Sequence, residues 1–120
     1  LRVSEGKITC LSIFANEQRV LVGDSRGELT VFELESEQQM VEVIRVTAHK
    51  KGVWAAAVSP DGTLIASGGE DKAFRIWELR SANLLKQVEE NDSSIRCLEF
   101  LDASAVLYCD NNPKKYIFSK

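Results

Sequence analysis

A histidine, a serine and an aspartate lie close together in the sequence, within the stretch AHKKGVWAAAVSPDGTLIASGGEDKAFRIWEL (48–79). His49, Ser67 and Asp71 are the residue types of a hydrolytic triad, in which histidine takes a proton from the serine nucleophile. Such a serine must sit on an exposed, strained turn beside a pocket and oxyanion donors. ASGGED lacks the G-x-S-x-G pattern, and Ser67 falls inside an apolar run that favours a strand. We therefore expect no catalytic residue here and interpret the three polar groups as structural.

The elements that position these residues belong to an internal repeat. ITCLSIF, VWAAAVS and IRCLEFL share one apolar pattern and start at residues 8, 53 and 95, which are 45 and then 42 residues apart. A second apolar run follows each of them, at 19–23, 64–69 and 105–109. A third run ends on an aromatic residue, at 29–32, 74–77 and 116–118, and the first two copies add a fourth, at 39–46 and 84–88.

These runs predict β-strands. They are short, rich in Val, Ile, Leu and Phe, and separated by Asp, Gly, Asn and Ser, including a turn predicted at NNPKKY (111–116). No stretch keeps a 3.6-residue period, so almost no helix is expected. The fold class is all-β, and four antiparallel strands repeated at this interval indicate β-propeller blades. The first run of each copy breaks strict alternation by one residue, which predicts a β-bulge.

The second copy resembles the WD-repeat β-propeller family. His49 stands where that family has the His of its Gly-His pair, with Ala48 replacing the Gly. VSPDG (58–62) matches the family's first hairpin turn, and IWEL ends the third strand with Glu78 where Asp is frequent. The resemblance implies a structural hydrogen-bond chain through four side chains, which here are His49, Ser67, Asp71 and Trp77.

We expect residues 1–120 to form a single WD-type propeller segment. Blade one spans 4–46, blade two 47–88 and blade three 89–120, which lacks its fourth strand; residues 1–3 resemble 44–46. Propellers close with about 4–8 blades, so three blades cannot form a ring. Either the chain is part of a larger propeller, which we favour, or several copies assemble into an oligomeric ring.

The family resemblance also implies a partner-binding top face. The positions carried over from the family are Lys7, Thr9, Ser25, Gly52, Trp54, Glu70, Ser94, Arg96 and Asn111. Trp54 is the strongest candidate, because Trp and Arg are enriched at interface hot spots. The alternative for Trp54 is packing against a neighbouring blade. For Arg96 and Glu70, the alternative is an ordinary solvated surface charge.

Composition argues against several other classes of protein. The chain has 120 residues, 44% of them hydrophobic, and a net charge of −3, which argues against a nucleic acid partner. No apolar run is long enough to span a membrane. Cys10, Cys97 and Cys109 lack metal-ligand spacing, so we expect free thiols in a reducing compartment, cytoplasmic or nuclear, and no metal site or cofactor.

The sequence therefore predicts a non-enzymatic scaffold that docks a partner protein or peptide on its top face. The alternative is a purely structural propeller segment whose partner is the rest of its own propeller, in the same chain or in copies of itself, or a neighbouring subunit. A propeller hydrolase is a remote third reading that no motif supports.

Overall fold

The structure is a computed structural model that describes residues 6–15, 18–36, 38–89, 91, 93–102, 104–110 and 113–117. Within these ranges every regular element is a β-strand, and they form three antiparallel sheets. No helix in the described part of the chain is long and apolar enough to cross a membrane. The side chains of residues 114–117 are not described.

Each sheet is a meander in which consecutive strands are neighbours. Sheet one consists of β1 (Ile8–Ile13), β2 (Arg19–Asp24), β3 (Glu28–Ser36) and β4 (Gln39–Thr47). Sheet two consists of β5 (Val53–Val58), β6 (Leu64–Gly69), β7 (Phe74–Glu78) and β8 (Asn83–Val88). Sheet three consists of β9 (Cys97–Asp102), β10 (Ala105–Cys109) and β11 (Pro113–Ile117).

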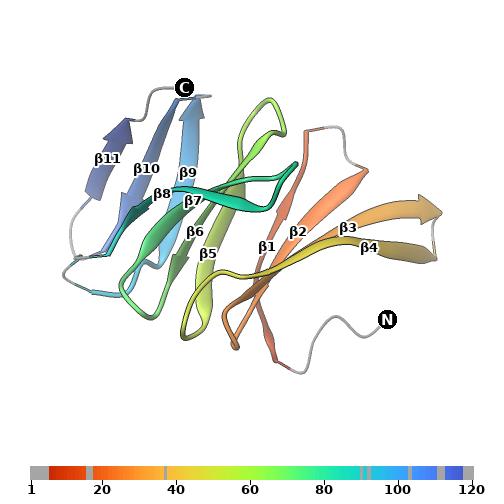
Figure 1. Ribbon diagram of the computed structural model, residues 1–120, viewed down its shortest axis with the longest axis horizontal. Helices are drawn as coiled ribbons and strands as arrows, with labels where there is room; N and C mark the ends of the chain where they lie inside the picture. The colour runs from red at the N-terminus through yellow and green to blue at the C-terminus, as the bar shows by residue number, and fades with distance from the viewer. Residues whose placement is uncertain are drawn as a thin grey trace.

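The three sheets stand side by side in chain order, with sheet two in the middle, and they do not close into a ring (Figure 1). The prediction of an all-β fold built from propeller blades is therefore confirmed. The predicted bulge is present in sheets one and two, because the pairing of β1 with β2 skips Thr9 and that of β5 with β6 skips Trp54. A bulge turns the extra side chain away from its regular direction.

The turn predicted at NNPKKY is only partly correct, because β11 already begins at Pro113. Proline has no N–H to donate to a neighbouring strand, so it is tolerated at the first residue of an edge strand. β11 pairs only with β10 and is such an edge.

The middle sheet is buried on both of its faces. Leu21 and Val31 of sheet one pack with Ile65 of sheet two in one apolar cluster. On the other face, Phe74 stacks on Tyr108 of sheet three with ring centroids 4.5 Å apart. The alternating residues of β5 therefore face different neighbours, and both sets are wholly or partly buried.

This arrangement corrects one reading of the sequence pattern. The apolar pattern of the first strand predicts that Val53, Ala56 and Val58 form its inward-facing set, and these residues face sheet one. Ala55 and Ala57 are buried as well, because they pack against sheet three. A pattern of small residues on both sides of a strand is what close packing between two sheets requires.

Two glycines let the sheets approach each other. A Cβ on Gly23 would lie 2.9 Å from Cγ1 of Val53, the first residue of sheet two's first strand. A Cβ on Gly68 would lie 2.2 Å from Cγ2 of Ile95, which precedes the first strand of sheet three. Val53 and Ile95 are fully buried at these points. The same contact therefore recurs between both pairs of sheets: an aliphatic side chain packs against the backbone of a glycine.

We expect Gly68→Ala to lower the free energy of unfolding by about 1–3 kcal/mol, because overpacking forces neighbouring backbone to shift. Urea unfolding followed by circular dichroism measures the loss. Gly52→Ala is the matched control, since its Cβ would meet Ser25 at 3.3 Å, and it should cost less. Equal stability of Gly68→Ala and the unmodified chain would contradict this account of sheet spacing.

Candidate functional site

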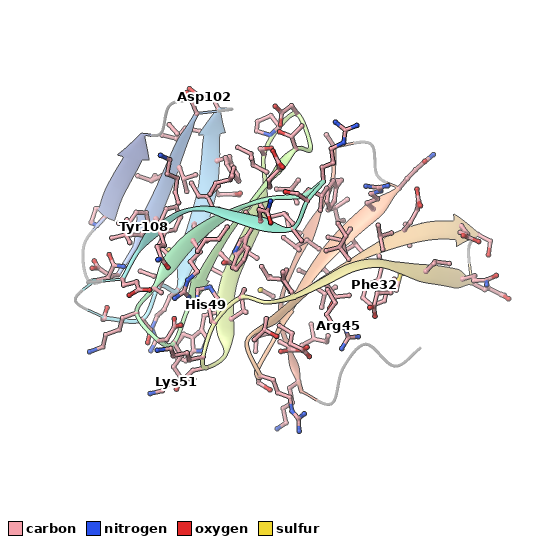
Figure 2. All side chains as sticks on the ribbon, viewed as in Figure 1. Phe32, Arg45, His49, Lys51, Asp102 and Tyr108 are labelled. Carbon is pink, nitrogen blue, oxygen red and sulfur yellow. The ribbon has the colours of Figure 1, made fainter. Side chains whose placement is uncertain are left out.

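The polar residues singled out in the sequence gather at one edge of the three sheets. We call this the top edge: the β2–β3 turn (24–28), the loop 48–52, the β6–β7 turn (70–73) and the segment 93–96. In Figure 2 this edge lies at the bottom of the view, where His49 and Lys51 are labelled, and Asp102 is labelled at the opposite edge. Short turns at the same end of successive meanders bring these segments together.

A hydrogen-bond chain joins the loop before β5 to the strands of sheet two. His49 Nδ1 lies 2.9 Å from Oδ1 of Asp71, and its Nε2 lies 2.9 Å from Oγ of Ser67. The indole N–H of Trp77 donates to the same Oγ at 3.2 Å. The structure thus brings together all four residues of the expected chain.

The donors and acceptors of this chain fit one protonation state. Trp77 is only a donor, so the Ser67 hydroxyl accepts from it, and its own O–H is available to donate to Nε2 of a neutral His49. His49 is then neutral, with its Nδ1–H donating to the Asp71 carboxylate. Burial lowers the pKa of His49, although Asp71 opposes this shift. Burial alone would raise the pKa of Asp71, but His49 and two backbone N–H groups outweigh it, so that pKa is lowered.

Arg75 is a member of this network that the sequence reasoning missed. Its Nη1 donates to the Ala48 carbonyl at 2.9 Å and to Oδ2 of Asp71 at 3.3 Å. Arg75 lies on β7, four residues after Asp71, and its side chain is mostly buried. A charged residue in a strand that is otherwise apolar, FRIW, was the available signal.

Asp24 is the second residue that the sequence reasoning missed. Alignment of the repeats places Arg26 of sheet one at the position of Asp71, so the repeat marks no carboxylate in the β2–β3 turn. Instead, Asp24 accepts hydrogen bonds from the backbone N–H of Arg26 at 2.9 Å and of Glu28 at 3.0 Å. Asp24 is buried, at 1% exposure. Sheet one therefore secures its turn from a different position.

Gly27 connects the turn of sheet one to the loop that carries His49. Its carbonyl accepts from the backbone N–H of Ala48 at 2.8 Å and of His49 at 3.1 Å. Its φ is +92°, and a Cβ would lie 2.1 Å from the His49 carbonyl oxygen. Both the backbone conformation and the close approach require glycine here.

The geometry is unsuited to attack by Ser67. Its side chain is fully buried, at 0% exposure, and its Oγ already contacts both Trp77 and His49. A nucleophile must reach a substrate carbonyl beside oxyanion donors. Among the described residues there is also no group of three or more His, Cys, Asp or Glu placed to hold a metal ion.

The expected docking residues are linked to one another across the sheets. Lys7 and Ser25 exchange hydrogen bonds at 2.8 and 2.9 Å, through the Ser25 N–H and the Lys7 N–H. The Thr9 hydroxyl donates to the carbonyl of Val53 in the next sheet. Lys7, Thr9 and Ser25 are all exposed.

The second group of docking residues joins sheets two and three. The Glu70 N–H donates to the Gly52 carbonyl at 2.9 Å, and the Ser94 hydroxyl donates to the Glu70 carbonyl at 3.3 Å. Glu70 is exposed and Ser94 half-buried, whereas Gly52 is buried. Asn111 lies outside the described residues.

Trp54 and Arg96 form the most direct contact of the set. The guanidinium carbon of Arg96 lies 4.2 Å from the centroid of the Trp54 ring, a cation–π contact between sheets two and three. Trp54 is half-buried and Arg96 exposed. Sequence reasoning had named both residues separately, and the structure places one on the other.

Comparison with known proteins gives a family match between β4 and β7. Residues 40–78 match the family model described as WD domain, G-beta repeat. Eukaryotic translation initiation factor 3 subunit I of Phaeosphaeria nodorum is 43% identical over 49 residues, 41% of this chain. Periodic tryptophan protein 2 homolog of Caenorhabditis elegans is 29% identical over 89% of the chain. Methylosome protein WDR77 of Xenopus laevis is 29% identical over 71% of the chain.

The stacked antiparallel meanders with bulged first strands define a β-propeller segment. The family match gives the finer assignment: residues 40–78 form a WD repeat, and the chain as a whole is similar to WD-repeat proteins. The matched regions span 15%, 12% and 26% of the lengths of those three relatives.

The buried histidine makes stability depend on pH in a defined direction. Below the ordinary histidine pKa of 6.5 the unfolded chain takes up a proton that folded His49 resists. The free energy of unfolding must then fall as the pH is lowered through that value. Asp71 adds a further loss only below its ordinary pKa of 3.8. Denaturant unfolding at a series of pH values measures the slope.

His49→Gln is the control for this slope, because His49 is the only histidine in the chain. The variant should show a flatter dependence between about pH 6.5 and pH 5, where carboxylates contribute little. An unchanged slope in His49→Gln would contradict the assignment.

We expect Asp71→Asn to lower the free energy of unfolding by about 1–3 kcal/mol, the cost of leaving buried donors with a poorer partner. Glu70→Gln is the matched control, since Glu70 is adjacent and exposed, and it should change stability by less than about 0.5 kcal/mol. Thermal unfolding measures both. A stable Asp71→Asn protein that had lost a hydrolytic activity of the parent would instead favour catalysis.

Proposed function

We propose that the chain is a non-enzymatic interaction scaffold that docks a partner protein or peptide on its top edge. The observation that carries this proposal is the stack of Arg96 on Trp54 across two sheets. Aromatic and arginine side chains dominate the binding energy of many interfaces. Here they form one contact on a framework that is held by hydrogen bonds.

The surroundings of the stack support docking. Face contact with the indole leaves the N–H groups of the Arg96 guanidinium directed sideways. Among the described residues no carboxylate is paired with Arg96, so these donors suit an acidic or carbonyl group on a partner. The exposed side chains of Lys7 and Glu70 extend the same edge. A rigid surface with polar donors loses little entropy when a partner binds.

The names of the relatives support a role within complexes. One relative is named as a subunit of a translation initiation factor, and another as a methylosome protein. By extension we propose a complex subunit located in the cytoplasm or nucleus. The cysteines in the described structure are free thiols, which fits a reducing compartment.

A second candidate function is purely structural, and one observation favours it. The outer face of sheet one exposes Ile8, Leu11 and Ile13 by 49%, 58% and 63%. They border an apolar hollow of about 530 Å³ with Val20, Val22 and Met40. Apolar surface of this kind is normally covered. On this reading its partner is a further propeller sheet, in the same chain or in a copy.

Substitution of the stack tests the docking proposal. Trp54→Ala and Arg96→Ala should each weaken partner binding about tenfold or more, because truncating a hot spot costs upwards of about 1.4 kcal/mol. The chain is immobilised, a protein captured from cell extract is identified, and its dissociation constant is then measured for each variant.

Arg80→Ala is the matched control, since Arg80 is an exposed arginine in the turn after β7, away from the top edge. It should bind the partner as the parent does. Thermal unfolding of all three variants separates loss of binding from loss of fold. Unchanged affinity in both Trp54→Ala and Arg96→Ala would overturn the proposal.

A further inference from the structure

Two of the three cysteines face each other across sheet three. Cys97 opens β9, Cys109 ends β10, and they are directly paired in the antiparallel register. Paired residues on antiparallel strands have Cα atoms about 4.5–5.5 Å apart and side chains on the same face. Disulfides need Cα separations of about 4.4–6.8 Å. The register therefore places the two thiols where a bond between their sulfurs can form.

The same position in the other sheets shows what is particular to this pair. Cys10 pairs with Gly23 in sheet one, and Ala55 pairs with Gly68 in sheet two. There the glycine makes room for the next sheet's aliphatic side chain, Val53 or Ile95. In sheet three, Cys109 stands where the glycine would be. The repeat thus carries a second thiol only in sheet three.

Within the three described sheets, the pair is more exposed than Cys10. Cys97 is exposed and Cys109 half-buried. Cys10 contacts the apolar cluster between sheets one and two, and burial raises the pKa of its thiol. The pKa of Cys109 is raised too, chiefly through its hydrogen bond with Cys97. The exposed Cys97 is therefore the sulfur that a reagent in solution meets first.

We propose that Cys97 and Cys109 are a redox-sensitive dithiol that closes to an intramolecular disulfide and thereby changes the Arg96–Trp54 stack. The oxidant is a small-molecule disulfide of the glutathione class. The effect on docking rests on the proposed function, whereas formation of the disulfide does not.

The chemistry is two thiol–disulfide exchanges. The Cys97 thiolate attacks one sulfur of glutathione disulfide, whose S–S bond breaks to release a glutathione thiolate. The Cys109 thiolate then attacks Cys97 in the mixed disulfide, and a second glutathione thiolate leaves. Two electrons pass to glutathione, and the two protons lost by the cysteines are taken up by the released thiolates.

The link to the top edge runs through Arg96. Arg96 precedes Cys97, and its backbone N–H donates to the Cys109 carbonyl at 3.3 Å. Its guanidinium lies on Trp54 at 4.2 Å. A disulfide must draw the two sulfurs to about 2.05 Å, much closer than a thiol–thiol hydrogen bond. Arg96 is bonded to Cys97 through the backbone and to Cys109 through this hydrogen bond, so any backbone adjustment at either cysteine reaches the Arg96 side chain.

Mass spectrometry of the intact chain tests the dithiol. After incubation with glutathione disulfide, the number of free thiols should fall from three to one, with no glutathione retained. Peptide mapping should recover one linkage, between Cys97 and Cys109. Cys10→Ser should form the same linkage, whereas Cys97→Ser and Cys109→Ser should stop at a mixed disulfide. Three free thiols after incubation, or a linkage that includes Cys10, would overturn the proposal.

Tryptophan fluorescence tests the coupling separately. Formation of the disulfide should shift the emission of the parent, and Trp54→Phe should remove most of that shift while Trp77 still emits. A disulfide formed without a change in Trp54 emission would overturn the coupling. Because neither readout uses a partner, both are independent of the binding test, so failure of one proposal is distinguishable from failure of the other.

Discussion

The close approach of neighbouring sheets at Gly23 and Gly68 is the constraint on which the rest of this structure depends. Val53 and Ile95 occupy the space that a side chain at those glycines would fill. This contact fixes where the first strand of each following sheet begins. The bulge that displays Trp54 comes one residue after Val53, and Arg96 comes one residue after Ile95. The spacing of the sheets therefore determines that these two side chains meet.

Buried polar groups hold the turns and loops of this apolar framework in place, and they do so differently in sheets one and two. In sheet two, the neutral His49 links a loop, a turn and two strands, and Arg75 completes the network. In sheet one, the Asp24 carboxylate holds its own turn through backbone N–H groups. Satisfied buried polar groups favour one arrangement over others, because any shift leaves a donor or acceptor without a partner. The top edge therefore rests on turns that are held in place.

The sequence predicted most of this fold, because its repeat and its alternation are both local signals. The strands 64–69 and 105–109 were located to the residue. The features that the sequence did not predict depend on residues that are distant in the chain. The burial of Ala55 and Ala57 reflects a third sheet that no local pattern reveals. Arg75 and Asp24 were missed because they take part from positions that the repeat does not mark. The contact between Trp54 and Arg96 required the register of two sheets.

Gly27 has a consequence for how the chain is assembled during synthesis. Its carbonyl receives the N–H groups of Ala48 and His49, so the turn of sheet one forms part of the seat for the His49 loop. A ribosome releases residues 24–28 before residues 48–52, and domains tend to fold from the N-terminus as they emerge. The first sheet can therefore fold first and provide the surface on which the His49 loop of the second sheet forms. Folding of the sheets in order from the N-terminus therefore depends on Gly27, a residue without a side chain.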